Sequence, residues 1–124
     1  MTNGMGSSIA IGRAVYVSGD ETVSLAVANS GTTKNVVGMV FDGSINAAAS
    51  GLIATSGAVT ATTAQWDAVT GQSGGLTPGA KYYLSNVTAG AITTTAPATG
   101  YVCPLGIATS DTTFILNILT TVKL

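Results

Sequence analysis

The chain has 124 residues, which is enough for one hydrophobic core but not for two. Charged residues make up only 7% of it, against about 25% in average globular proteins, whereas 46% of its residues are hydrophobic. This composition excludes intrinsic disorder, and the four scattered Lys and Arg residues exclude a nucleic-acid partner, which needs a basic stripe. No apolar run approaches the roughly 20 residues that span a bilayer, so no membrane partner is expected.

The first segment, residues 1–8, lacks the basic and apolar regions of a signal peptide and predicts a flexible N-terminal arm on a protein made in the cytoplasm. Beyond it, short apolar runs rich in Thr, Val and Ile alternate with turn-forming clusters such as Asp42-Gly43, which is the pattern of strands joined by hairpins. The predicted strands are, in chain order, 9–18, 22–28, 35–41, 51–54, 58–60, 81–85, 91–95, 101–109 and 113–122.

One segment departs from the strand pattern. Thr62-Thr63-Ala64-Gln65 matches a capping box, because Gln65 follows a hydroxyl residue by three positions. It predicts one short helix near residues 62–70, and the alternative is a loop in which Trp66 closes one end of a barrel. In either case the large indole of Trp66 is expected to be buried.

The second half of the chain resembles the first at a spacing of about half its length. Ile9-Ala10-Ile11-Gly12 with Tyr16 aligns with Leu76-Thr77-Pro78-Gly79 with Tyr83, and Gly38 then aligns with Gly106. Coincidence in a Gly-rich chain is the alternative. We therefore predict an all-β domain over 9–124, a compact β-barrel or sandwich of two similar halves, about 9–55 and 76–124, with 56–75 as linker.

The expected core contains the largest apolar residues and two glycines at matching positions of the halves. These residues are Tyr16, Gly38, Trp66, Tyr83, Gly106, Phe114 and Leu116. The run 114–119 predicts a central strand buried on both faces, and Cys103 reads as a small buried hydrophobe. Since Tyr82 and Tyr83 alternate on a strand, one ring is expected in the core and the other is free for a subunit or partner contact.

No set of residues predicts catalysis. Gly71-Gln72-Ser73-Gly74-Gly75 matches the G-x-S-x-G string of hydrolases, but the chain has no histidine to activate the serine, so a flexible Gly-rich linker is the better interpretation. One cysteine and no histidine do not provide a zinc site, and Asp42 and Asp111 suit ordinary turns better than calcium. We expect no enzyme, no catalytic residue, no metal and no cofactor.

Four strings resemble virion proteins of tailed bacteriophages. They are Trp66-Asp67-Ala68-Val69-Thr70-Gly71, the stretch 74–85 (GGLTPGAKYYLS), the stretch 90–97 (GAITTTAP) and Pro104-Leu105-Gly106-Ile107-Ala108. They are similar to head decoration (cement) and head-fibre proteins, and to β domains of tail fibres. The similarity covers mainly residues 56–119, and the first half follows more loosely.

This resemblance implies a compact β fold that assembles as a homo-oligomer, a trimer, on the outer capsid surface, with the major capsid protein as partner and without enzymatic residues. The expected function is a decoration or head-fibre base protein that stabilises the phage head, located in the virion after synthesis in the host cytoplasm. The alternative is a tail-fibre or baseplate β module that binds a host receptor. Because this chain reads as a complete short protein and not as part of a long fibre, decoration is favoured.

Overall fold

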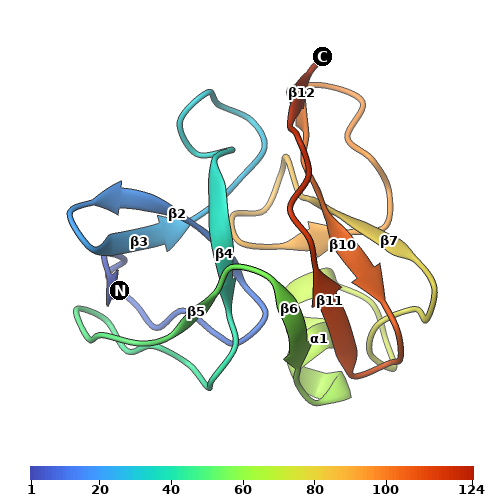
Figure 1. Cartoon of the computed structure of the whole chain (residues 1–124), viewed down its shortest axis with the longest axis horizontal. Coiled ribbons are helices and arrows are strands. Elements are labelled where there is room, and N and C mark those ends of the chain that lie inside the picture. The colour runs from blue at the N-terminus through green and yellow to red at the C-terminus, as the bar shows by residue number, and fades with distance from the viewer.

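Two five-stranded sheets lie side by side in the computed structural model, which describes residues 1–124 (Figure 1). The first sheet has the order β1-β3-β2-β4-β5, and its strands are β1 Thr2–Asn3, β2 Ala14–Gly19, β3 Thr22–Leu25, β4 Val36–Val40 and β5 Ile53–Ala54. The second has the order β6-β11-β10-β7-β8, and its strands are β6 Gly57–Thr60, β7 Lys81–Leu84, β8 Ile92–Thr93, β10 Pro104–Ala108 and β11 Thr113–Leu116. A ribbon of β9 Tyr101–Val102 and β12 Val122–Lys123 completes the strands.

The prediction of an all-β fold with one short helix is confirmed, and the sheets curl into a compact sandwich. The helix, α1 Thr63–Thr70, begins with the predicted capping box. The Gln65 amide donates to Thr62 Oγ1 at 3.2 Å, and the Thr62 amide donates to Gln65 Oε1 at 2.9 Å. The helix ends at Gly71, whose φ of 74° is the left-handed conformation that glycine adopts without strain. No helix of the chain has the length and apolar character needed to cross a membrane.

The two sheets contain the same four-strand arrangement. Strands β3-β2-β4-β5 of the first half have the same neighbours, in the same antiparallel sense, as β8-β7-β10-β11 of the second. The register agrees as well, because Tyr16 lies opposite Val36 and Tyr83 opposite Pro104, each pair beside a register shift. The halves thus share a topology, whereas duplication of the sequence itself stays a prediction.

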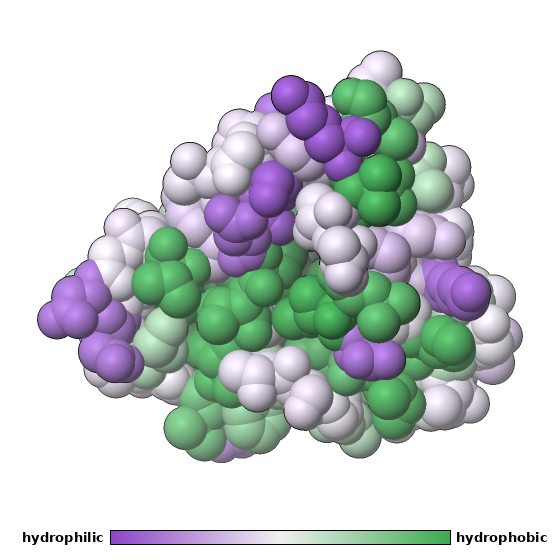
Figure 2. Space-filling view, turned by 45° about the horizontal axis from the view of Figure 1, so that its top comes forward, coloured by the Kyte–Doolittle hydropathy of each residue, from purple (hydrophilic) through white to green (hydrophobic).

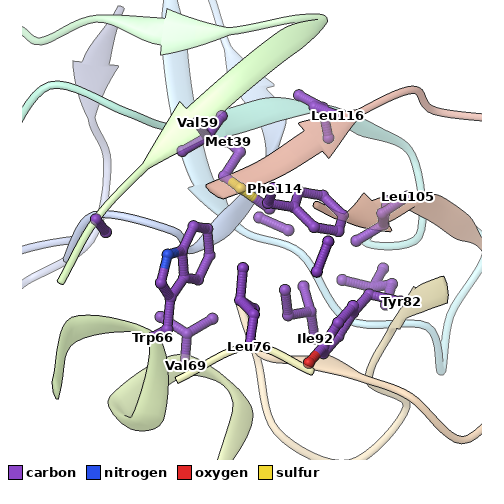
Figure 3. Close-up of a cluster of buried hydrophobic side chains, with 14 of the residues drawn as sticks. Met39, Val59, Trp66, Val69, Leu76, Tyr82, Ile92, Leu105, Phe114 and Leu116 are labelled. Atoms are coloured by element: carbon purple, nitrogen blue, oxygen red, sulfur yellow. The ribbon is translucent and has the colours of Figure 1, made fainter. Parts of the chain in front are cut away.

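The main hydrophobic core lies on the inner side of the second sheet (Figure 3). Trp66 and Val69 of α1 enter it from one side, and Met39 of the first sheet enters it from another. The indole of Trp66 is fully buried and donates its Nε1 hydrogen to the Thr112 carbonyl at 2.8 Å. Cys103 is a buried free cysteine, as the sequence predicts. This core therefore joins the helix and both sheets into one domain.

The N-terminal segment 1–8 packs against the first sheet, in contrast to the flexible arm expected from the sequence. Thr2 and Asn3 form β1, which pairs in parallel with β3. Met1 and Met5 pack against a second, smaller core made of Ile9, Val15, Val23, Val40 and Ile45. The physical reason is the side chain of Asn3, which is 1% exposed and forms three hydrogen bonds within the fold.

Residues 56–75 form part of the second half and do not act as the predicted linker. Strand β6 pairs with β11, and α1 follows it along the chain. The Gly-rich stretch after α1 is held by the Asp67 carboxylate, which accepts hydrogen bonds from the amides of Gly74 at 3.2 Å and Gly75 at 2.8 Å. Two charge-assisted bonds to consecutive amides fix a loop whose glycines alone suggest flexibility.

Candidate interaction surface

A groove of about 250 Å³ lies on the outer face of the second sheet. Its apolar wall is formed by Tyr83, Pro104, Ile107, Ile115 and Leu119. Lys81 and Asn117 supply the main polar side chains at its border. The groove therefore offers apolar surface with little charge.

Strand periodicity places these side chains outside. On β11, Phe114 and Leu116 point into the core, so Ile115 between them points outward and is 36% exposed. Ile107 lies directly opposite Ile115 on β10 and is 42% exposed. The pair gives the sheet an apolar outer patch that no other part of the chain covers.

The two adjacent tyrosines have opposite roles, and the prediction that Tyr83 belongs to the core is wrong. The Tyr82 ring is fully buried and meets the Phe114 ring edge-on, with 5.7 Å between centroids. Its hydroxyl donates to Gln72 Oε1 at 2.6 Å and accepts from the Thr77 amide at 2.9 Å. Tyr83 is only half-buried and lines the groove. The sequence correctly predicts one inner and one outer ring but assigns the two wrongly.

The C-terminal run also differs from its prediction, because β11 is central but buried on one face only. The strand ends at Leu116, and the chain continues beside β10 without joining the sheet. The Asn117 amide donates to the Leu105 carbonyl at 2.7 Å, and the Leu119 amide to the Pro104 carbonyl at 3.1 Å. These two bonds hold Leu119, which is 54% exposed, at the edge of the groove.

The remaining predicted core residues are placed as follows. Trp66, Phe114, Leu116 and Gly38 are buried, whereas Tyr16 and Gly106 are half-buried. Tyr16 packs against the main core from the first sheet. Gly106 lines the groove, and its neighbour Ile107 is exposed. Gly106 and Tyr83 therefore belong to the surface site and not to the interior.

A second apolar hollow, of about 320 Å³, lies on the first sheet. Met1, Val37, Leu52 and Ile53 line it, and Leu52 is 58% exposed. Figure 2 shows hydrophobic side chains gathered in a broad band on one face of the molecule, with few hydrophilic side chains between them. With so little charge in the chain, the exposed apolar groups are the surface features that could sustain a stable contact.

The polar residues do not gather into a reactive constellation. The G-x-S-x-G string follows α1, whereas a nucleophile elbow requires a strand before the serine and a helix after it. No group of three or more His, Cys, Asp or Glu side chains is close enough to hold a metal ion. Arg13 is used structurally, because its guanidinium donates to the Ala68 carbonyl near the C-terminal end of α1 at 3.0 Å.

The chain was compared with protein-family models, curated proteins and solved structures. No family model, no curated protein and no solved structure matches the chain.

Proposed function

We propose that the chain is a non-enzymatic structural protein of a tailed-bacteriophage head, a decoration (cement) or head-fibre base protein. It binds the outer surface of the capsid through the major capsid protein, acts as a homo-oligomer such as a trimer, and stabilises the head. The physical requirement for this role is a rigid domain with surfaces suited to repeated contacts, since a cement protein occupies many equivalent sites.

The observation that supports the proposal most directly is the position of the strings that resemble phage virion proteins. The stretch 74–85 forms the turn before β7 and β7 itself, and it contributes Lys81 and Tyr83 to the groove. The string 104–108 forms β10 and contributes Pro104 and Ile107. The residues that carry the resemblance are therefore also residues that build the apolar groove on the second sheet.

The low charge of the chain gives the proposal a testable consequence. Contacts between apolar and hydrogen-bonding groups contain few ion pairs for salt to screen, so attachment to the head is expected to weaken little with ionic strength. We would mix purified protein with heads assembled without it and measure co-sedimentation between about 0.05 M and about 1 M NaCl, where the Debye length falls from above 10 Å to about 3 Å. Saturable binding that changes less than about threefold is the expected result, because ion-pair-driven binding changes far more over this range.

Two outcomes contradict the proposal. Failure to co-sediment at any salt concentration removes the head as partner, and release near molar NaCl shows that the contact is electrostatic. Binding of the same protein to host cells, in place of heads, supports the alternative of a tail-fibre or baseplate module that contacts a receptor. Val87→Lys with Thr88→Lys adds two charges at exposed residues in the turn between β7 and β8, outside the groove, and serves as the control for the effect of charge elsewhere on the domain.

A further inference from the structure

The shared register identifies one corresponding face on each sheet. On the first sheet this face, called A1, consists of Ala14, Tyr16, Val36, Met39 and Ala54. At the same register positions of the second sheet, face A2 consists of Lys81, Tyr83, Pro104, Ile107 and Ile115. The match is residue by residue, since Met39 lies opposite Ala54 as Ile107 lies opposite Ile115.

The two faces differ in what covers them. Face A1 packs into the main core, where Ala14 and Met39 are fully buried. The surface that covers it is the inner side of the second sheet, called B2, which includes Leu105 and Phe114. Face A2 has no such cover, because its five residues are all among those that line the open groove.

The first sheet also has a face that corresponds to B2. This counterpart, called B1, holds Val37 where B2 holds Leu105, and Ile53 where B2 holds Phe114. The N-terminal segment and the loop that contains Ile45 close part of B1. The rest is open, because Val37 and Ile53 line the 320 Å³ hollow beside the exposed Leu52.

We propose that copies of this chain associate head to tail, with face A2 of one copy covering the open part of face B1 of the next. The contact repeats between chains the packing of A1 against B2 that exists within each chain. Groove and hollow are different surfaces, so the contact is heterologous. Successive copies form a closed ring if the rotation that relates one copy to the next adds up to a full turn. This inference rests on the self-assembly part of the proposed function, whereas it needs no particular shell.

The first test is the mass of the full-length protein in solution by sedimentation velocity or light scattering. Ile107→Glu places a charge in the groove, and Leu52→Glu places one beside the hollow. Each is expected to weaken association by roughly a hundredfold, since an unpaired charge in a desolvated contact loses its hydration and gains no partner. Both positions are exposed in the single chain, so the variants should fold, and melting curves verify this. The control is Val87→Glu, at a residue 82% exposed and outside both surfaces, which should assemble like the unaltered protein.

The second test distinguishes a head-to-tail contact from a two-fold one. A mixture of the Ile107→Glu and Leu52→Glu chains retains one intact hollow and one intact groove, so it should form a one-to-one dimer and nothing larger. A contact of groove with groove instead predicts that Leu52→Glu assembles normally and that the mixture gives no mixed dimer. That result, or an unaltered protein that stays monomeric at about 100 μM, a concentration at which even micromolar contacts are populated, overturns the inference.

Neither test contains phage heads. An oligomer that passes both tests but does not bind heads contradicts the shell assignment alone. A monomer that still binds heads contradicts the head-to-tail contact alone.

Discussion

The two halves of the molecule place four equivalent strands in the same register, but they differ in which faces of the sheet are covered. The first half is covered on A1 by the second half and on part of B1 by its own N-terminal segment and the Ile45 loop, which leave Val37 and Ile53 at an open hollow. The second half is covered on B2, by α1 and by the first sheet, and is open on A2. A shared backbone arrangement therefore does not determine which faces become interior.

Side-chain size explains much of this difference. Where the first sheet meets the second, face A1 has Ala14 and Ala54, whose small side chains let the sheets approach. At the corresponding positions face A2 has Lys81 and Ile115, which are too large for that approach and, in the case of lysine, too costly to bury. Different side chains at equivalent strand positions thus make A1 part of the interior and A2 part of the surface.

The largest effect is expected where β11 separates the buried face B2 from the open face A2. Leu116→Asp places a carboxylate among fully buried apolar side chains, at a cost of about 5 kcal/mol or more, comparable to the whole stability of a small domain. We expect insoluble protein on expression. Ile115→Asp is the matched control one residue away and should give a soluble protein, because its side chain points outward. Equal solubility and melting of both variants would contradict the assignment of the two faces.

The two glycines at matching positions allow a sharper comparison of the halves. A Cβ on Gly38 would overlap the Ala54 carbonyl oxygen, and a Cβ on Gly106 would overlap the Ile115 carbonyl oxygen. Gly106 also has a φ of 152°, which L side chains rarely adopt, and a Cβ there would lie 3.0 Å from Cζ of Phe114.

Gly38→Ala is therefore expected to cost about 2 to 3 kcal/mol through overpacking alone. Gly106→Ala should cost about 4 kcal/mol, because backbone strain adds about 1 to 2 kcal/mol. Urea unfolding measures both values, and Gly43→Ala, in open space but at a φ of 75°, isolates the strain component. If Gly106→Ala lowers the free energy of unfolding no more than Gly38→Ala does, the backbone conformation of Gly106 adds no strain to the variant.

Sequence patterns predict most of this fold because its strands obey local rules. Alternation and turn residues locate β3, β4, β7 and β10 to within three residues, and the capping box locates α1. Strand β2 begins five residues later than predicted. Strand β1 is missed because two polar residues, Thr2 and Asn3, carry no apolar pattern. The hydrogen bonds of Asn3 join it to Ile45, 42 positions away, and no local pattern contains such information.

The groove on the second sheet is only partly predictable from the sequence, because it also depends on contacts between distant residues. The alternation of Tyr82 and Tyr83 shows that one ring points outward, but deciding which one requires the register with β10 and the partners of the Tyr82 hydroxyl. The run 114–119 reads as uniformly apolar, so the exposure of Ile115 is visible only once the outer face of the sheet is found uncovered. Burial on both faces is a tertiary property that a run of apolar residues does not specify.

The smallest effect is expected for the segment that covers the first half. The Asn3 side chain donates to the carbonyls of Ser7 and Ile45, both at 2.9 Å, and accepts from the Met5 amide at 2.7 Å. Asn3→Ala removes these bonds and leaves the Met5 amide without its acceptor, at a cost of about 2 kcal/mol. The cost is not larger because the Ile45 carbonyl still accepts a hydrogen bond from the Ile9 amide.

Thermal unfolding of Asn3→Ala should show a midpoint lowered by about 8 °C, and Thr2→Ala, which removes one long exposed contact to Ser50, should shift it by less than about 2 °C. Hydrogen exchange then locates the loss. The amides of residues 4–9 and of β3 should exchange faster in Asn3→Ala, whereas those of α1 should not, because α1 covers the other half. Equal melting of both variants would mean that the hydrogen bonds of Asn3 add no net stability to the packing of residues 1–8 against the first sheet.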